Sequence, residues 1–369
     1  MSTRWKPRSP PIAPGRKRAA NASWKRRASL PGPKPKPILK PPPNKLTAAQ
    51  DRRWLDAAAR LALRGRPLAR PNPSVGALIV KDGRVVGRGW TQAGGRPHAE
   101  AVALQQAGAA AIGATLYVTL EPCAHLSPRG PSCASLLAES GIARAIVGCG
   151  DPDPRTAGQG LERMRAAGIE TALVDHAASR KSLAGYLMRA HLGRPHVTLK
   201  LAISLDGCIA LADGSSRWIT GAEARAHVHS RRALADVILV GGGTWRADAP
   251  RLDARLPGLA DRNPERVVLT RGTIEGPRCI ASPEAIATLD AQYLYVEGGA
   301  ATAAAFLAAD LVDRLDIYRA PIVIGNGLPA ITDIGLGDLA EAHGRWQRAE
   351  TRLLGEDIYE RFERVRDKG

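Results

Sequence analysis

Four side chains suited to metal chemistry recur in the N-terminal half of the sequence. His98 and Glu100 stand in the stretch PHAEAVAL, and Cys123 and Cys133 stand in the later stretch LEPCAHLSPRGPSC. One imidazole and two thiolates are ligands that zinc prefers, and a catalytic zinc with three protein ligands keeps its fourth position for water. The metal would lower the pKa of that water toward neutrality. Glu100, two residues from His98, would then take its proton and pass it to a leaving group.

The elements around these residues are predicted to bring them together. HAEAVALQQAG predicts a helix that starts at His98, ATLYVTLEP predicts a strand that ends before Cys123, and CASLLAESG predicts a helix that starts at Cys133. Two helix N-termini at one end of a sheet can converge on one point, and their positive ends favour a thiolate. Alone, each residue is more often ordinary core. Their order on strand ends and helix starts favours a metal site.

The remaining N-terminal pattern predicts an α/β sandwich over residues 47–192. TAAQDRRWLDAAARLALRG is an amphipathic helix for which Thr47 is a plausible N-cap, and SVGALIVKDGRVVGRGW is a hairpin turned at Asp82-Gly83. ARAIVGCGDP predicts a further strand, and GQGLERMRAAGIETALV predicts a helix followed by a strand. The region 180–196 is predicted to join this domain to the next.

A second α/β domain is predicted over residues 193–369. PHVTLKLAISLDGCIA, VILVGGGT, RVVLT, YLYVEGGA and RLDIYRAPIVIG read as strands, and AEARAHVHSRRALAD and ATAAAFLAADLVD read as helices. This alternation predicts a largely parallel sheet. Glycine-rich turns follow two of the strands, where a backbone can approach a pyrophosphate closely, so one dinucleotide could lie across both. The glycines do not form G-x-G-x-x-G, which disfavours a Rossmann unit.

The net charge of +18 is concentrated at the N-terminus. The first fifty residues hold 13 Lys and Arg and no acid, so 53 − 13 = 40 basic residues face 35 acidic ones in the remainder. Residues 1–46, rich in proline, are expected to be disordered and partly polyproline II. This tail could be without a role, a tether to an anionic surface, upstream sequence translated from an early start codon, or a transit peptide.

Cysteine usage and hydropathy indicate a cytoplasmic protein. Five cysteines without a secretory signal indicate a reducing compartment, so thiols are available for metal. No apolar run reaches the roughly 18 residues that a membrane helix needs.

The spacing of the metal-site residues separates two groups of zinc deaminases. The H-x-E element is typical of them, and the nucleoside and polynucleotide enzymes place their cysteines as P-C-x-x-C. Here nine residues separate Cys123 from Cys133. With PNPSVGALIV and DPDP, this pattern resembles the deaminase of riboflavin biosynthesis. That resemblance implies a cytidine-deaminase-like fold acting on a phosphoribosylated diaminopyrimidine.

The resemblance also implies residues that contact the substrate. Asn72 matches a pyrimidine-contacting position, although a tight turn would equally explain an asparagine there. His125 lies in the loop CAHLSPRGPSC, which is one residue longer than the family's usual CSHHGRTPPC. Family members usually have asparagine where this chain has Asp153.

The second half resembles the reductase domain of the same bifunctional family, in KLAISLDGCIA, SRWITG and GGGTWRADAPRLDAR. The resemblance implies a dihydrofolate-reductase-like fold that uses NADPH. It implies cofactor contacts at Ala202, Trp218, Thr244, Asp248, Gly298 and Gly299. It implies substrate contacts at Ser216, Arg232, Leu252, Arg255 and Glu297. A guanidinium at Arg232 or Arg255 can hold a sugar phosphate bidentately, although Arg232 could equally be a solvated helix residue.

The sequence therefore predicts a bifunctional deaminase and reductase of the riboflavin pathway, with zinc and NADPH as cofactors and a phosphoribosyl-pyrimidine as substrate. The family commonly forms homo-oligomers, and no membrane or nucleic-acid partner is expected. One alternative is an RNA-binding zinc deaminase steered by its basic tail. Another keeps the deaminase and makes the second half a non-catalytic oligomerisation module.

Overall fold

The computed structural model describes residues 48–125 and 129–366 of the chain, which belong to one compact unit. The predicted disordered tail and the predicted N-cap Thr47 lie outside the described residues, so both stay predictions. No helix in the described ranges is long and apolar enough to cross a membrane.

The N-terminal half is built on one five-stranded sheet with the order β2-β1-β3-β4-β5. Strand β1 is antiparallel to both neighbours, whereas β3, β4 and β5 are parallel. The predicted hairpin is confirmed, with its turn at Asp82 and Gly83, both at positive φ. The strands are β1 (Gly76–Lys81), β2 (Arg84–Trp90), β3 (Thr115–Val118), β4 (Arg144–Val147) and β5 (Glu170–Leu173).

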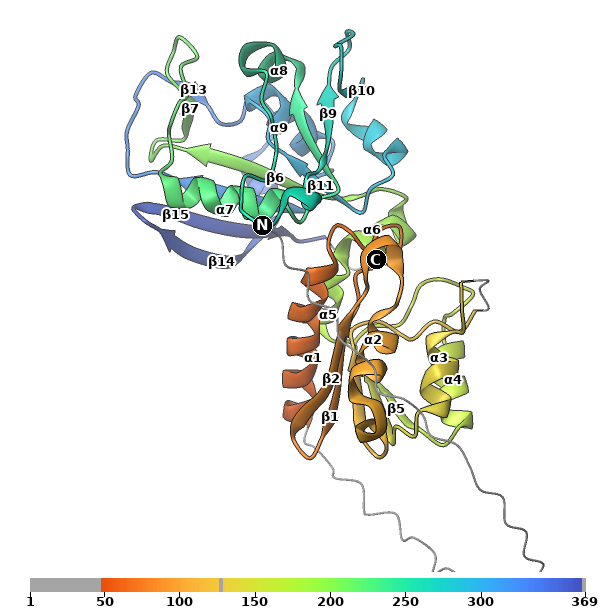
Figure 1. Cartoon of the computed structure of the whole chain (residues 1–369). Coiled ribbons are helices and arrows are strands. Elements are labelled where there is room, and N and C mark those ends of the chain that lie inside the picture. Colours follow the sequence, from red (N-terminus) through yellow and green to blue (C-terminus); the bar gives the residue numbers. More distant parts are fainter. Residues whose placement is uncertain (1–47, 126–128, 367–369) are drawn as a thin grey trace, which may run out of the picture. The chain divides into compact units, whose positions relative to one another are not determined.

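Helices cover both faces of this sheet, as Figure 1 shows. The predicted amphipathic helix packs Leu55 and Ala58 against one face, where its Asp51 accepts hydrogen bonds from the Tyr117 hydroxyl and the Arg144 guanidinium. The alanine-rich helix after His98 packs on the opposite face. The α/β/α sandwich is thereby confirmed. Its helices are α1 (Ala48–Ala62), α2 (Ala99–Ala107), α3 (Cys133–Glu139), α4 (Gln159–Ala166), α5 (Ala177–Ser182) and α6 (Ala184–Leu192).

The C-terminal half is built on an eight-stranded sheet with the order β10-β9-β8-β11-β6-β12-β15-β14. The strands from β10 to β12 are mutually parallel, in line with the predicted parallel sheet. These strands are β6 (His196–Ile203), β8 (Val237–Gly241), β9 (Glu265–Leu269), β10 (Arg278–Ile280), β11 (Tyr293–Val296) and β12 (Arg314–Arg319).

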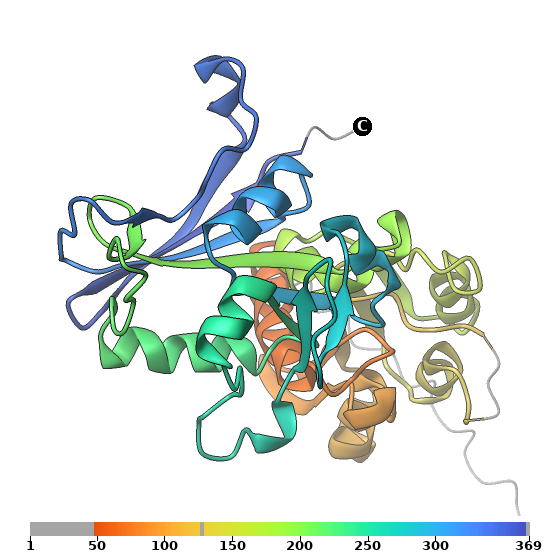
Figure 2. The same cartoon turned by 90° about the horizontal axis from the view of Figure 1, so that it is seen from above.

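Helices flank this sheet on both faces too. Figure 2 shows α7 in green and α9 in blue on opposite sides of it. Phe306 of α9 packs on Val197 and Leu199, and Val228 of α7 packs on the other face with Ile238. The glycines after β8 begin a helix, whereas a loop was expected. The helices are α7 (Ala222–Arg232), α8 (Gly242–Asp248) and α9 (Ala300–Ala308).

Two features of the strands differ from the prediction. Antiparallel strands β14 (Trp346–Leu354) and β15 (Asp357–Arg364), which were not predicted, extend the sheet beyond β12. The single strand predicted for PHVTLKLAISLDGCIA is divided into β6 and β7 (Cys208–Ala210), and β7 pairs with β13 (Leu328–Pro329) in a separate two-stranded sheet. The apolar residues of the β14–β15 hairpin are interrupted by charged ones, so it shows no long apolar run. Its inner strand pairs through polar contacts, because buried Asp316 accepts from the Tyr359 hydroxyl and the Arg361 guanidinium.

Two glycines of β2 set how closely α2 approaches the sheet. A Cβ at Gly89 would lie 2.1 Å from the Ala99 carbonyl oxygen, and one at Gly87 would lie 2.2 Å from that of Ala103. Only a strand without side chains at these positions lets the helix backbone lie this close. The N-terminus of α2, and the chemistry it carries, is therefore positioned by glycine.

We predict that Gly89→Ala lowers the free energy of unfolding by about 1–3 kcal/mol, because helix backbone must move to admit the methyl group. Gly337→Ala is the matched control, since a Cβ there meets nothing within 4 Å. The control should change stability by less than about 0.5 kcal/mol. Denaturant unfolding measures both, and equal midpoints for the two variants would contradict the packing argument.

Candidate active sites

The predicted metal ligands come together in the N-terminal domain. The ligand atoms of His98, Cys123 and Cys133 all lie within 4.8 Å of one another, with both cysteines buried. The His98 Nδ1 atom is 3.5 Å from the Cys123 Sγ and 3.3 Å from the Cys133 Sγ. Nitrogen and sulfur ligands at ordinary zinc distances in a tetrahedron are roughly 3.5 Å apart. The arrangement therefore fits a zinc ion with three protein ligands.

Local structure holds each ligand in place. His98 is the N-cap of α2, Cys123 lies in the loop after β3, and Cys133 is the first residue of α3. The Ser132 side chain caps α3 by accepting from the Ser135 amide. The Cys133 amide donates to the Cys123 sulfur at 3.3 Å. Converging helix starts and strand ends, as predicted from the sequence, thus form the site.

A buried carboxylate two residues before Cys123 anchors the surrounding loops. Glu121 was not singled out in the sequence, and its side chain is 4% exposed. Its two oxygens accept from the backbone amides of Asp151, Gly158, Gly160 and Leu161 at 3.1–3.5 Å. This carboxylate ties the loop that carries Cys123 to the start of α4.

The thiols of Cys123 and Cys133 shift each other's pKa in opposite directions. A hydrogen bond from the Cys133 thiol lowers the pKa of Cys123 to about 4 against the effect of burial, and His98 adds to the lowering. The same hydrogen bond raises the pKa of Cys133 well above its ordinary value. Cys123 is therefore a thiolate at neutral pH, which is the form that binds metal.

Glu100 lies in the first turn of α2, beside the three ligands. Its side chain is buried, and burial raises the pKa of its carboxyl to about 7, although His98 opposes the rise. The carboxyl also interacts with the Cys133 thiol. A carboxyl with a pKa near neutrality can both accept and donate a proton at physiological pH.

Of the predicted substrate contacts, Asn72 lies beside the metal cluster, and His125 follows the ligand Cys123 by two residues. The Asn72 Nδ2 atom is 3.1 Å from the His98 Nε2 and 3.0 Å from the Gly95 carbonyl oxygen. The His98 ring is thus contacted at both nitrogens, by the sulfurs at Nδ1 and by Asn72 at Nε2. His125 Nδ1 is 3.4 Å from the hydroxyl of buried Thr156.

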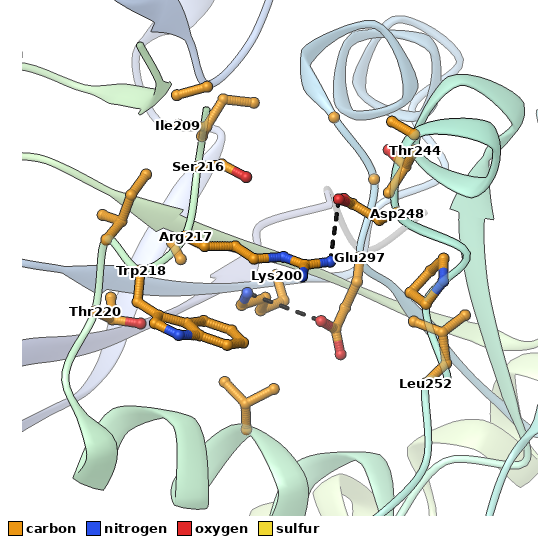
Figure 3. Close-up of a pocket in the computed structure, with 18 of the residues that line it drawn as sticks. Lys200, Ile209, Ser216, Arg217, Trp218, Thr220, Thr244, Asp248, Leu252 and Glu297 are labelled. Carbon is orange, nitrogen blue, oxygen red and sulfur yellow. Dashed lines mark hydrogen bonds and ion pairs between the residues drawn. The ribbon is translucent and has the colours of Figure 1, made fainter. Parts of the chain in front are cut away.

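All of the predicted reductase residues line one cavity of about 790 Å³ in the C-terminal domain. Figure 3 shows side chains from several elements pointing into it, with Trp218 on one side and Thr244 and Asp248 on the other. The Trp218 ring is 67% exposed, and the Arg225 guanidinium lies 4.9 Å from its centre. The cavity lining includes Ala202, Ser216, Trp218, Arg232, Thr244, Asp248, Leu252, Arg255, Glu297, Gly298 and Gly299.

An ion cluster lies at the floor of this cavity. The Arg232 guanidinium binds both oxygens of Glu297, with Nε–Oε1 at 2.6 Å and Nη2–Oε2 at 2.9 Å, and its Nη1 donates to the Asp253 carbonyl. Lys200 Nζ lies 3.8 Å from Glu297 Oε2 (Figure 3). Burial opposes the charge on Glu297, but the two cations outweigh it and hold the pKa of the carboxyl below its ordinary value.

Lys200 was not predicted from the sequence. It is a lone charged residue in the apolar run VTLKLAIS, and burial lowers the pKa of its ammonium. A lysine on a strand that otherwise faces the core could have predicted a buried acidic partner, because a buried ammonium requires one.

A second cavity, of about 640 Å³, shares Gly243, Thr244 and Gly299 with the first. It lies at the carboxyl ends of β8 and β9, and its walls include Arg246 and Arg271. Within residues 48–125 and 129–366, neither arginine forms an ion pair with a carboxylate. Cavities at the carboxyl ends of parallel strands, with glycines and cations, suit a phosphorylated dinucleotide. Neither arginine was predicted. Arg246 lies within the motif GGGTWRADAPRLDAR, but the resemblance implied no contact at that position, and Arg271 lies outside the recognised motifs.

Comparisons with known families agree with both halves of this description. Residues 48–149 match the cytidine and deoxycytidylate deaminase zinc-binding region, and residues 195–278 and 279–359 match the RibD C-terminal domain. The riboflavin biosynthesis protein RibD of Aquifex aeolicus is 34% identical over 354 residues, which cover 85% of this chain and 98% of that protein.

Solved structures show the same arrangement of domains. Acinetobacter baumannii RibD superimposes with a TM-score of 0.77 at 34% identity, over 86% of this chain and 99% of that one. A Thermotoga maritima diaminohydroxyphosphoribosylaminopyrimidine deaminase/5-amino-6-(5-phosphoribosylamino)uracil reductase superimposes with a TM-score of 0.76 at 32% identity, over 86% and 99%. The predicted fold class and the predicted pair of activities are thereby confirmed. The chain belongs to the RibD family of riboflavin biosynthesis proteins, with a zinc-binding deaminase domain followed by an NADPH-dependent reductase domain.

Proposed function

We propose that the N-terminal domain hydrolyses an exocyclic amine of 2,5-diamino-6-ribosylamino-4(3H)-pyrimidinone 5′-phosphate, releasing ammonia. The C-terminal domain then reduces the ribosyl group of the product to a ribityl chain with NADPH. The observation that carries this proposal is that both predicted sets of residues assemble, one around a three-ligand metal cluster and one around a single cavity. The substrates named for the Thermotoga maritima relative support it.

In the deaminase, His98, Cys123 and Cys133 would hold the zinc, and Glu100 would transfer protons. Zinc supplies a site that polarises water and lowers its pKa. The oxygen of water bonds to the ring carbon, and the exocyclic nitrogen leaves as ammonia. Glu100 would therefore take protons from the water and deliver them to the leaving nitrogen. Its burial and its pKa of about 7 suit both steps.

Asn72 and His125 would orient the pyrimidine beside the zinc. The Asn72 side chain contacts the imidazole ring of His98, an expected zinc ligand. Its amide group would therefore lie close enough to bind a substituent of the pyrimidine ring. His125, in the loop between the cysteines, would contact the substrate from the other side. Asp153 stands near it and is paired with Arg155.

In the reductase, Glu297 would accept hydrogen bonds from ribose hydroxyls, and Arg232 would keep it ionised. We assign the sugar phosphate to Arg255, because the fork of Arg232 binds both oxygens of Glu297. The Arg255 side chain is half exposed, and its Nε pairs with Asp253 at 2.9 Å, so a phosphate would bind its outer nitrogens. Ser216 and Leu252 complete this part of the lining. Bound NADPH would supply the hydride that C1′ of the sugar gains, while the bond from C1′ to the ring oxygen breaks and that oxygen takes a proton from water.

The cofactor would extend from this cavity into the second one. Ala202, Trp218 and Asp248 line the first cavity, and Thr244 and Gly299 line both, so one elongated molecule can contact all of them. Gly298 has to be glycine, since a Cβ there would lie 2.4 Å from the Thr302 side chain. Arg246 and Arg271 would face the anionic adenosine end.

The two alternative functions are not favoured. The match of residues 195–359 to a reductase-type domain, together with its lined cavity, argues against a non-catalytic second half. The nine-residue spacing argues against an RNA deaminase. The homo-oligomer, the cytoplasmic location and the domain boundaries at residues 46 and 192 stay predictions.

Replacing Glu100 by glutamine should lower the deaminase kcat at least about 100-fold, because proton transfer contributes that much or more. Zinc content and reduction of supplied deaminated substrate should not change. Ammonia release, NADPH oxidation and metal analysis measure the three quantities. Glu139→Gln, an exposed change in the same domain, is the control. Near-normal ammonia release by metallated Glu100→Gln protein would refute the assignment.

Replacing Arg271 by alanine should raise the KM for NADPH roughly tenfold, the effect of losing one charge-assisted contact to a phosphate. The KM for NADH, which lacks the 2′-phosphate, should stay within about twofold of the wild-type value. Steady-state reduction at varied cofactor concentration measures both constants. Equal losses with NADPH and NADH would place the phosphate elsewhere, and Arg246→Ala then tests the neighbouring arginine.

A further inference from the structure

A glutamine in the C-terminal half contacts the loop that carries Asn72. Gln292 is 9% exposed and directly precedes β11. Its Nε2 donates to the Pro71 carbonyl at 2.9 Å and to the Asn72 carbonyl at 3.3 Å. A residue 220 positions away in the sequence thus binds the backbone of the residue next to the metal cluster.

Asn72 is therefore held at two ends. Its carbonyl oxygen accepts from Gln292, and its side-chain amide lies 3.1 Å from His98 and 3.0 Å from the Gly95 carbonyl oxygen. A shift of the backbone at Asn72 would move the amide relative to His98 and to any pyrimidine bound there.

Gln292 is itself held firmly. Its backbone amide donates to the buried carboxylate of Asp236 at 2.8 Å, and its carbonyl accepts from the His196 amide at 2.8 Å. The next residue, Tyr293, donates to the same carboxylate. A side chain fixed at the start of a central strand makes a rigid support, as a positioning contact requires.

Other contacts join the same loop to the C-terminal half without touching Asn72. Arg66 donates to the Leu234 carbonyl at 2.7 Å, and its guanidinium lies over the Tyr293 ring. Arg262 donates to the carbonyls of Arg64 and Arg66. Arg70, two residues before Asn72, donates to the Asp290 carbonyl. These contacts hold the loop before Asn72, whereas Gln292 binds the carbonyl of Asn72 itself.

We propose that Gln292 is a positioning residue of the deaminase, although it belongs to the reductase half of the chain. By holding the Asn72 carbonyl it sets the place of the Asn72 amide, and deamination therefore depends on a strand that ends at the reductase residue Glu297. The inference rests on the proposed role of Asn72 as a substrate contact. Small misplacements of such a group are costly, because reaction rates depend steeply on orientation.

The test compares Gln292→Met, which keeps the length of the side chain and removes the donor, with Arg262→Ala in the full-length protein. For Gln292→Met we expect the KM of the deaminase substrate to rise roughly three- to tenfold, the range for loss of one hydrogen bond, with a smaller change in kcat. Zinc content and the reduction of supplied deaminated substrate should not change. Arg262→Ala should leave all of these deaminase constants within about twofold of wild type.

Several results would overturn the proposal. One is an unchanged deaminase KM in Gln292→Met, and another is a parallel loss in both activities and in both variants, which a merely structural role would produce. Gln292→Glu, of nearly the same shape but without the amide donor, provides the test if the methionine variant does not fold. Asn72→Ala distinguishes the substrate-contact role of Asn72 from the positioning role of Gln292. If it deaminates normally, the substrate role of Asn72 is wrong, whereas a loss there with normal Gln292 variants refutes the positioning role alone.

Discussion

Both active sites depend on one geometric constraint, namely that parallel strands end at the same edge of a sheet and the helices that follow them begin there. In the N-terminal sheet this edge gathers Cys123 after β3, while α2 and α3 bring His98 and Cys133 to it. In the C-terminal sheet the ends of β8 and β11 bring the glycines of α8 and α9 to one cavity. At other places on a sheet, residues from such distant segments of the chain would not be brought to one site.

The two sites use buried carboxylates in opposite ways. The Glu100 side chain is buried, and burial raises the pKa of its carboxyl to about 7 and leaves it able to exchange protons. The Glu297 side chain is also largely buried, but Arg232 and Lys200 keep it ionised, so it serves as an acceptor. The difference lies in the neighbouring cations rather than in the depth of burial. Glu121 shows a third use, because it accepts hydrogen bonds from four backbone amides and so has a structural role.

Rigid support is supplied from distant parts of the chain. Glycines in β2 let α2 lie against the sheet, and α2 in turn carries His98 and Glu100. Strand β11 binds the Asn72 loop at its beginning and leads into Glu297 at its end. The active-site residues therefore rest on elements whose own sequences carry no catalytic signal.

The sequence by itself determined the chemistry and the local elements. The types and order of His98, Glu100, Cys123 and Cys133, with their nine-residue gap, identified a zinc deaminase, and the glycines after two strands led to the prediction of a dinucleotide site. These features depend on residue type and short-range periodicity, which are readable without a structure. Only the tertiary structure decided which charged groups pair. In it the Arg232 guanidinium binds both oxygens of Glu297, and Lys200 lies beside them. It alone placed Gln292 against Asn72 and added the polar hairpin β14–β15 to the sheet. Such partners are set by the packing of segments far apart in the chain, where no local spacing relates one residue to the other.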